Sequence, residues 1–201
     1  MNQDKEQALT LELLEAIEER EDLTQRHLAN RLGVALGLAN SYLKRCVKKG
    51  YVKIRQAPAN RYLYYLTPKG FTEKSRLTGE FLRFSFGFYR RASESCAQVF
   101  RQLDETGLHK VVLYGASDLA EIAMLGAAEY AMTVVAVCDP GSEPGRFVNA
   151  PLCRRIEDCP AFDVCILTTL SDGQAIYQQL SRLLGDNRIV APEILGLQAP
   201  P

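Results

Sequence analysis

The 201-residue sequence contains no apolar run approaching the roughly 20 residues that a membrane-spanning helix requires. Its N-terminal segment is polar and acidic, whereas a signal peptide begins with basic residues followed by apolar ones. No CxxC pair occurs among its six cysteines, which excludes the usual zinc-knuckle and dithiol redox motifs. We therefore expect a cytoplasmic protein with no membrane partner and no metal site, in which Cys138 and Cys165 are small buried hydrophobes.

Histidine is scarce as well. The two histidines, His27 and His109, have no plausible nucleophile or second metal ligand beside them in the sequence. Asp118 and Glu121 are better interpreted as acids at a helix N-terminus than as an acid/base pair. We therefore predict no catalytic residue and no enzyme activity.

Acidic residues are nearly missing from one long segment, residues 24–83, which contains 13 Lys and Arg but only 2 Asp and Glu. The formal net charge of zero hides a net charge of +6 in residues 1–90 and −6 in residues 91–201. A basic half attracts a polyanion such as double-stranded DNA, and an acidic half repels one. The charge pattern therefore indicates two domains with different partners.

Three helices are predicted in the first 50 residues. Apolar residues at helical spacing indicate the first over residues 5–20. The hydroxyl of Thr24 can cap the second, which Gly33 ends. The third is predicted from about residue 36 to residue 49, stopping at Gly50 as a left-handed cap. Its predicted buried residues are Leu38, Leu43 and Val47.

The third helix and the two strands after it predict a surface that reads DNA. Asn can bond adenine in the major groove, Ser or Gly permits close approach, and Lys or Arg takes phosphate or guanine. Strands at 51–55 and 62–66, joined by a turn-rich loop, would form a wing. The predicted DNA contacts are Thr24, Gln25, Gly37, Asn40, Ser41, Lys44, Arg45, Lys48, Arg55, Asn60 and Arg61. The alternative is a basic face on a winged helix that binds protein.

Short motifs within residues 9–84 resemble MarR-type regulators associated with exopolysaccharide gene clusters. They include Leu32-Gly33-Val34, Lys49-Gly50-Tyr51-Val52-Lys53 and Leu66-Thr67-Pro68-Lys69-Gly70. The resemblance implies a dimeric transcription regulator. At Ala35 these regulators usually have a capping Ser, so a frayed or displaced start of the third helix is expected.

A long helix is predicted to begin at Pro68, because apolar residues recur at steps of three and four from Leu77 to Leu103. Five large aromatic residues fall within 81–89, too many for one face of a solvated linker. We predict a dimer seam over residues 68–106, because helix-turn-helix proteins usually read two half-sites through a two-fold axis. Packing against the C-terminal domain of the same chain is the alternative.

The last hundred residues follow the order of a dinucleotide-binding βαβ unit. A strand run at 110–114 leads into Gly115 and an apolar helix, and a second strand at 133–138 ends at Asp139. Asp139 lies 24 positions after Gly115, near the usual spacing for a ribose-binding carboxylate. Two more strand runs, at 163–168 and 188–190, flank a helix opening at Ser171.

The predicted fold class is α/β in three parts. Residues 1–67 form a winged helix-turn-helix, residues 68–106 a connecting helix, and residues 107–201 a Rossmann-like domain with a doubly wound parallel sheet.

The glycine turn departs from the nucleotide-binding pattern. Ser117 stands where a second glycine would let the backbone approach a pyrophosphate, and Ala120 replaces a third glycine. A phosphate at the helix N-terminus remains compatible with this sequence. The predicted ligand-binding residues are Gly115, Ala116, Ser117, Asp118, Leu119, Asp139, Thr168 and Thr169. A ligand-free oligomerisation scaffold is the alternative.

This half resembles CoA-binding and Rex-like Rossmann domains, and the nucleotide-sugar-binding half of bacterial sugar acyltransferases, through its runs at 112–116, 135–140 and 164–168. The resemblance implies a nucleotide such as NAD, CoA or a nucleotide sugar. We therefore predict a homodimeric DNA-binding transcription regulator with a small-molecule effector. A nucleotide-using enzyme with an accessory DNA-binding module is a third hypothesis.

Overall fold

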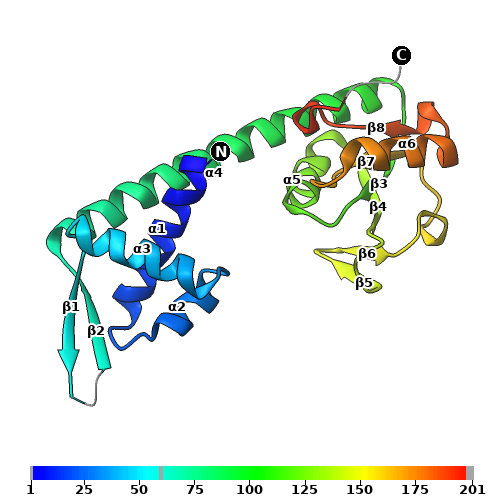
Figure 1. Ribbon diagram of the computed structural model, residues 1–201. Coiled ribbons are helices and arrows are strands. Elements are labelled where there is room, and N and C mark those ends of the chain that lie inside the picture. The colour runs from blue at the N-terminus through cyan, green and yellow to red at the C-terminus, as the bar shows by residue number, and fades with distance from the viewer. Residues whose placement is uncertain (1, 59–60, 198–201) are drawn as a thin grey trace. The chain divides into compact units, whose positions relative to one another are not determined.

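Figure 1 shows the computed structural model, in which residues 2–58 and 61–197 are described. The chain forms two compact units, residues 1–86 and 87–201, and the boundary between them falls within one long helix. Each unit has its own hydrophobic core.

The first unit is a winged helix-turn-helix. Its elements are α1 (Asn2–Glu19), α2 (Gln25–Arg31), α3 (Leu36–Lys48), β1 (Val52–Ala57) and β2 (Arg61–Leu66). The two strands pair antiparallel, with Val52 opposite Leu66 and Ala57 opposite Arg61. Side chains of α1, α2 and α3 form most of the core, and Leu77 of the following helix joins them. This arrangement confirms the predicted order of elements.

Single residues set the ends of these short helices. The Thr24 hydroxyl accepts a hydrogen bond from the His27 amide at 3.1 Å and so caps α2. Gly33 and Gly50, which follow α2 and α3, have φ angles of +59° and +76°, a region that favours glycine. Ala35 precedes α3 and makes no side-chain cap bond, yet α3 begins at Leu36 as the sequence indicates. The expected displacement of this helix start is therefore wrong.

The prediction that Leu38 is buried is also wrong. Ala39, Leu43 and Cys46 are the buried residues of α3, whereas Leu38 is 45% exposed. Successive helical residues are about 100° apart, so Leu38 points away from the side that carries Ala39 and Leu43. An apolar side chain therefore lies on the surface of this helix.

One helix, α4 (Pro68–Glu105), contains 38 residues and confirms the predicted long helix. The Thr67 hydroxyl, just before it, donates to the carbonyl oxygen of Gly50 at 2.6 Å and accepts from the Gly70 amide at 3.0 Å. A Cβ on Gly70 would lie 2.1 Å from the carbonyl oxygen of Tyr51. The Thr67-Pro68-Lys69-Gly70 motif therefore fixes the start of α4 against the turn between α3 and β1.

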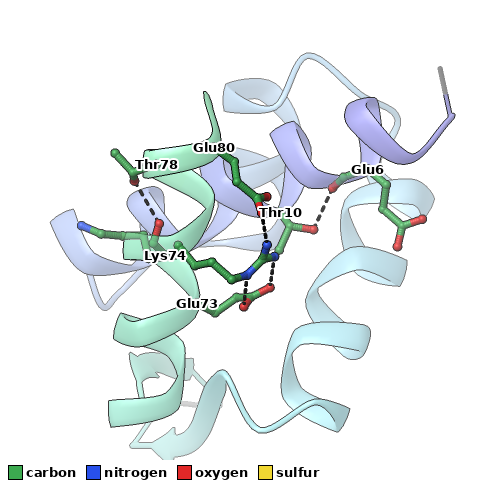
Figure 2. A network of polar contacts seen from close by, with 7 residues as sticks. Glu6, Thr10, Glu73, Lys74, Thr78 and Glu80 are labelled. Carbon is green, nitrogen blue, oxygen red and sulfur yellow. Dashed lines mark hydrogen bonds and ion pairs between the residues drawn. The ribbon is translucent and has the colours of Figure 1, made fainter. Parts of the chain in front are cut away.

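Ion pairs stiffen the first turns of α4, where Figure 2 shows Glu73 and Glu80 joined by dashed lines to the side chain between them. One further pair attaches these turns to α1. Lys74 pairs with Glu18 of α1, and the Arg76 guanidinium bonds Glu73 at 2.9 Å and Glu80 at 2.6 Å. The hydrogen bonds from Arg76 lower the pKa of the Glu73 carboxyl. These contacts hold residues 73–80 within the first unit.

The apolar stripe of α4 has three different environments. Leu77 is buried in the core of the first unit. Five later residues of α4 are buried in the core of the second unit, namely Ala92, Cys96, Val99, Phe100 and Leu103. Between them, Phe81 and Phe84 are 56% and 73% exposed. The alternative hypothesis, packing against the C-terminal domain of the same chain, thus holds for the C-terminal end of the stripe. The aromatic side chains in its middle are exposed in the single chain.

The second unit is built on a six-stranded sheet with the order β5-β6-β4-β3-β7-β8. All neighbouring pairs are parallel except β5 and β6, which are antiparallel. The strands are β3 (Lys110–Tyr114), β4 (Thr133–Cys138), β5 (Gly145–Phe147), β6 (Ala150–Cys153), β7 (Val164–Leu167) and β8 (Ile189–Val190). The sequence predicted β3, β4, β7 and β8 but not the short β5–β6 hairpin.

Helices lie on both faces of this sheet. The C-terminal part of α4 and α5 (Asp118–Ala127) share one core cluster with the sheet, and α6 (Gly173–Leu184) shares the cluster on the opposite face. Short 3₁₀ helices lie at Ala128–Tyr130, Ile156–Asp158, Asp186–Arg188 and Glu193–Leu195. The fold is therefore α/β with a doubly wound, mostly parallel sheet, as predicted. The strand order reverses between β3 and β7, which is the position where such sheets bind ligands.

Candidate DNA interface and ligand crevice

One face of α3 carries four of the eleven predicted DNA contacts. Gly37, Ser41, Lys44 and Lys48 are all exposed and follow one another at steps of three and four. This spacing places them on the same side of the helix, opposite the buried Ala39 and Cys46. A helix whose outer face holds small and cationic residues can approach base edges closely while binding phosphates.

A groove of about 300 Å³ runs beside this face and brings three predicted residues together. Gln25 of α2 and Asn40 and Lys44 of α3 line it, together with Leu43, Val47 and Ile54. The Asn40 side-chain oxygen is buried and has no hydrogen-bond partner among the described residues. Such an acceptor is rarely left unpaired in a folded protein.

Arg45 differs from the other predicted contacts because it already has partners in the chain. Its guanidinium pairs with Glu6 of α1 and lies 5.3 Å from the centre of the Tyr42 ring. Local sequence patterns do not indicate this pair, because Glu6 and Arg45 are 39 residues apart. The charge of Arg45 is therefore already partly neutralised by Glu6 before another anion binds.

The wing is described in part. Arg55 of β1 is exposed, and Arg61 is the first residue of β2. Asn60 lies outside the described residues. The roles of these three residues stay predictions.

Sequence reasoning left out two cations that lie beside this surface. Arg26 of α2 and Lys53 of β1 are exposed, and neither pairs with an acid among residues 2–58 and 61–197. The low acid content of residues 24–83 was the available signal for both. Lys44, Lys48 and Arg55 likewise have no acidic partner in the described part of the chain. Five unpaired cations on one unit are a strong attraction for a polyanion.

At the switch point of the second unit, the predicted crevice residues contact one another. Gly115 has a φ of +108°, and a Cβ there would lie 2.6 Å from the backbone of Thr169. The Thr168 hydroxyl donates to the Gly115 carbonyl at 2.7 Å. The Ser117 hydroxyl donates to the Thr168 carbonyl at 2.6 Å and accepts from the Ala120 amide at 3.3 Å. Ser117 is thus the N-cap of α5 and also ties the glycine turn to the end of β7.

The Asp139 carboxylate binds the glycine turn directly. One of its oxygens accepts from the Ala116 amide at 3.0 Å, and the other accepts from the Gly141 amide at 2.8 Å. The Ala116 amide is one of the groups expected to face a ligand phosphate. The amides of Asp118 and Leu119, at the start of α5, have no backbone acceptor among the described residues. Ligand binding by any of these residues stays a prediction.

Three further properties concern other kinds of site. Among the described residues, no cluster of three or more His, Cys, Asp and Glu is arranged to hold a metal ion. No helix in this part of the chain is both long and apolar enough to cross a membrane. Burial raises the pKa of the Tyr114 hydroxyl, near the crevice, to about 12.

The comparisons with known proteins bear on the first unit. Residues 7–53 match the family model described as winged helix-turn-helix DNA-binding. The match covers α1 from residue 7, α2, α3 and the start of β1. The first unit is thus similar to winged helix-turn-helix DNA-binding domains. No curated protein sequence matches the chain.

Similar solved structures share little sequence with the chain. The PcaV transcriptional regulator from Streptomyces coelicolor is 22% identical over 49% of this chain and 75% of its own, with a TM-score of 0.40. PigF with SAH is 19% identical over 94% of this chain and 73% of its own, with a TM-score of 0.36. Human N-acetylserotonin methyltransferase in complex with SAM is 13% identical over 94% of this chain and 74% of its own, with a TM-score of 0.33.

Proposed function

We propose that this protein is a homodimeric transcription regulator that binds operator DNA through α3 and the wing. The observation that supports this proposal best is the exposed face of α3, where Lys44 and Lys48 accompany Gly37 and Ser41. Neither lysine has an acidic partner among the described residues. The winged helix-turn-helix match over residues 7–53 supports the same function.

In this proposal, α3 lies in the major groove. Gly37 and Ser41 allow close approach, while Asn40 and Lys44 bond base edges or phosphates along the groove that they share with Gln25. The exposed Leu38 adds an apolar contact of the kind that recognises a thymine methyl group. Arg55 and Arg61 of the wing bind the neighbouring backbone or minor groove.

Two adjacent substitutions test this assignment. Lys44→Ala should weaken binding to operator DNA by about 1 to 3 kcal/mol if the side chain contacts a base, with relaxed specificity at that base. Arg45→Ala should cost less, because Arg45 already pairs with Glu6. Fluorescence anisotropy with a duplex enriched from a random pool by the wild-type protein measures both affinities.

Gln102→Ala is a matched control, since this exposed residue of α4 lies outside the first unit. It should leave the affinity unchanged. Equal affinities for wild type and Lys44→Ala would show that α3 is not the recognition helix.

The exposed aromatic residues in the middle of α4 support the proposed dimer. Phe81, Phe84, Phe86 and Tyr89 are each at least 46% exposed. Phe81 and Phe84 also line a mainly apolar groove of about 510 Å³ with Ala8, Leu11 and Leu77. Exposed aromatic residues at this density are typical of protein interfaces, and a two-fold dimer presents two recognition helices to two half-sites.

Phe84→Glu should abolish or strongly weaken the dimer, because it places a charge in an apolar interface. A loss on the order of 2 kcal/mol or more in dimerisation free energy is expected. Light scattering of the full chain at micromolar concentration measures the mass, and Leu125→Glu, at an exposed position of α5, is the control. A wild-type chain that is already monomeric would contradict the proposal that α4 forms a dimer interface.

The proposed effector is a small anionic metabolite of the nucleotide class, such as NAD, CoA or a nucleotide sugar. Its phosphate would bind the amides of Asp118 and Leu119, and its ribose or sugar would contact Asp139. Binding that favours one arrangement of the two recognition helices would change operator occupancy.

A thermal-shift screen with these compounds measures effector binding. The Tm should rise with one of them and rise less for Asp139→Asn, which keeps the side chain's shape but loses its charge. Unchanged melting with every compound would favour the scaffold hypothesis.

A further inference from the structure

Three thiols meet at one end of the sheet in the second unit. Cys138 ends β4 and Cys153 ends β6, and the two residues are partners in the parallel ladder. Paired residues of neighbouring strands project to the same face, so both side chains lie on the α6 side of the sheet. Cys159 packs against the same cluster from the segment that follows β6.

The turn between Cys153 and Cys159 places both thiols against the same short backbone segment. The 3₁₀ helix at Ile156–Asp158 reverses the chain, and the Cys153 thiol donates to the Asp158 carbonyl at a distance of 3.8 Å. The Cys159 thiol donates to the Arg155 carbonyl at 3.7 Å, across the same turn. Both side chains pack into the same apolar cluster, which also contains Cys138.

The three thiols differ in accessibility. Cys138 is fully buried in the sheet, while Cys153 and Cys159 are each half-buried. Only the last two can be reached by a solute without opening the sheet. A pair of neighbouring, accessible thiols in a short turn is the arrangement in which one sulfur can resolve an oxidised form of the other.

We propose that Cys153 and Cys159 are a thiol oxidation site that forms an intramolecular disulfide with a hydroperoxide. In the first step the peroxide oxidises one thiol to a sulfenic acid and is reduced, with release of water when the oxidant is hydrogen peroxide. In the second step the other thiol attacks that sulfur, forms the S–S bond and releases a second water. The two thiols lose two electrons, and the peroxide gains them.

The environment makes this reaction slow at neutral pH. Burial raises the pKa of the Cys153 thiol, and the hydrogen bond with Cys138 followed by burial raises that of the Cys159 thiol. The negative charge of Asp158 also raises the pKa of both thiols. Since the thiolate is the nucleophile, the site responds to sustained exposure to oxidant. Its chemistry is independent of the proposed DNA binding.

Peptide mapping of the full-length protein tests the proposal. After treatment with hydrogen peroxide and alkylation in denaturant, four of the six cysteines should carry the alkyl group. Trypsin cleaves after Arg154 and Arg155, so the bond should join peptide 147–154, which holds Cys153, to peptide 156–182. Mass spectrometry detects the linked pair and its loss on reduction.

Peptide 156–182 holds both Cys159 and Cys165, so a matched pair of variants identifies the sulfur. Cys165→Ser should keep the link, and Cys159→Ser should lose it. Six alkylated cysteines in the treated wild-type protein would overturn the proposal. A bond from peptide 111–146, which holds Cys138, would overturn it as well, and the wild-type result does not depend on the folding of any variant.

Discussion

Gly70→Ala should destabilise the first unit more than any other single methyl group added to it. Gly70 is buried in the first turn of α4, and a Cβ there would lie 2.1 Å from the Tyr51 carbonyl oxygen. That oxygen accepts a hydrogen bond from the Thr67 amide at 2.9 Å, so the backbone cannot easily move away. Overpacking against backbone costs about 3 kcal/mol or more, and it should also weaken DNA binding by displacing β1 from α3.

A second glycine of the same helix is the control for Gly70. A Cβ on Gly79 meets nothing within 4 Å, so Gly79→Ala should stabilise α4 by about 0.5 to 1 kcal/mol. Hydrogen exchange followed by mass spectrometry resolves the two units in the full chain. Equal exchange of residues 24–66 in Gly70→Ala and wild type would show that the Tyr51–Gly70 contact is not tight.

Gly115→Ala should have the matching effect on the second unit. Its φ of +108° is unfavourable for any residue with a Cβ, and that atom would lie within 2.8 Å of three atoms of Thr169. Backbone strain and displacement of the β7–α6 connection together should cost on the order of 3 kcal/mol. The hydrogen bonds of Ser117 and Thr168 across this junction should be lost with it.

Gly107→Ala separates the two contributions to that cost. Gly107 also has a positive φ, +72°, but its Cβ would meet nothing within 4 Å, so only the backbone contribution of about 1 kcal/mol applies. The Tm of the second unit should therefore fall much further in Gly115→Ala than in Gly107→Ala. Similar losses in the two variants would mean that Thr169 does not constrain the turn.

Local signals made the helix ends and the main strands predictable. Thr24, Gly33 and Gly50 have the roles that their residue types favour at helix ends, and the apolar runs at 110–114 and 133–138 are the strands β3 and β4. These signals depend on residues only a few positions apart. These signals did not identify the buried side of α3, where Ala39 is buried in place of the predicted Leu38. That side depends on the neighbouring helices.

Features that depend on distant residues were not predictable. The pairing of Arg45 with Glu6 joins positions 39 apart, and the bond from the Ala116 amide to Asp139 joins positions 23 apart. The β5–β6 hairpin was not predicted because its strands are only three and four residues long and contain Gly145 and Pro151. The proximity of Cys153 and Cys159 required the 3₁₀ turn between them. Tertiary packing decides the first two of these features, and the last two are local elements too short for periodicity to indicate.

The salt dependence of binding between the full-length protein and duplex DNA tests the central claim most directly. Counterion release predicts that the logarithm of the affinity falls linearly with the logarithm of salt concentration, with a slope of about −0.9 per phosphate contacted. We expect a steep slope for wild type and a slope shallower by about 1 for Lys48→Ala if this lysine binds a phosphate. No binding of wild type even at low salt, or identical slopes for wild type and a variant with Lys44, Lys48 and Arg55 all changed to Ala, would contradict the account.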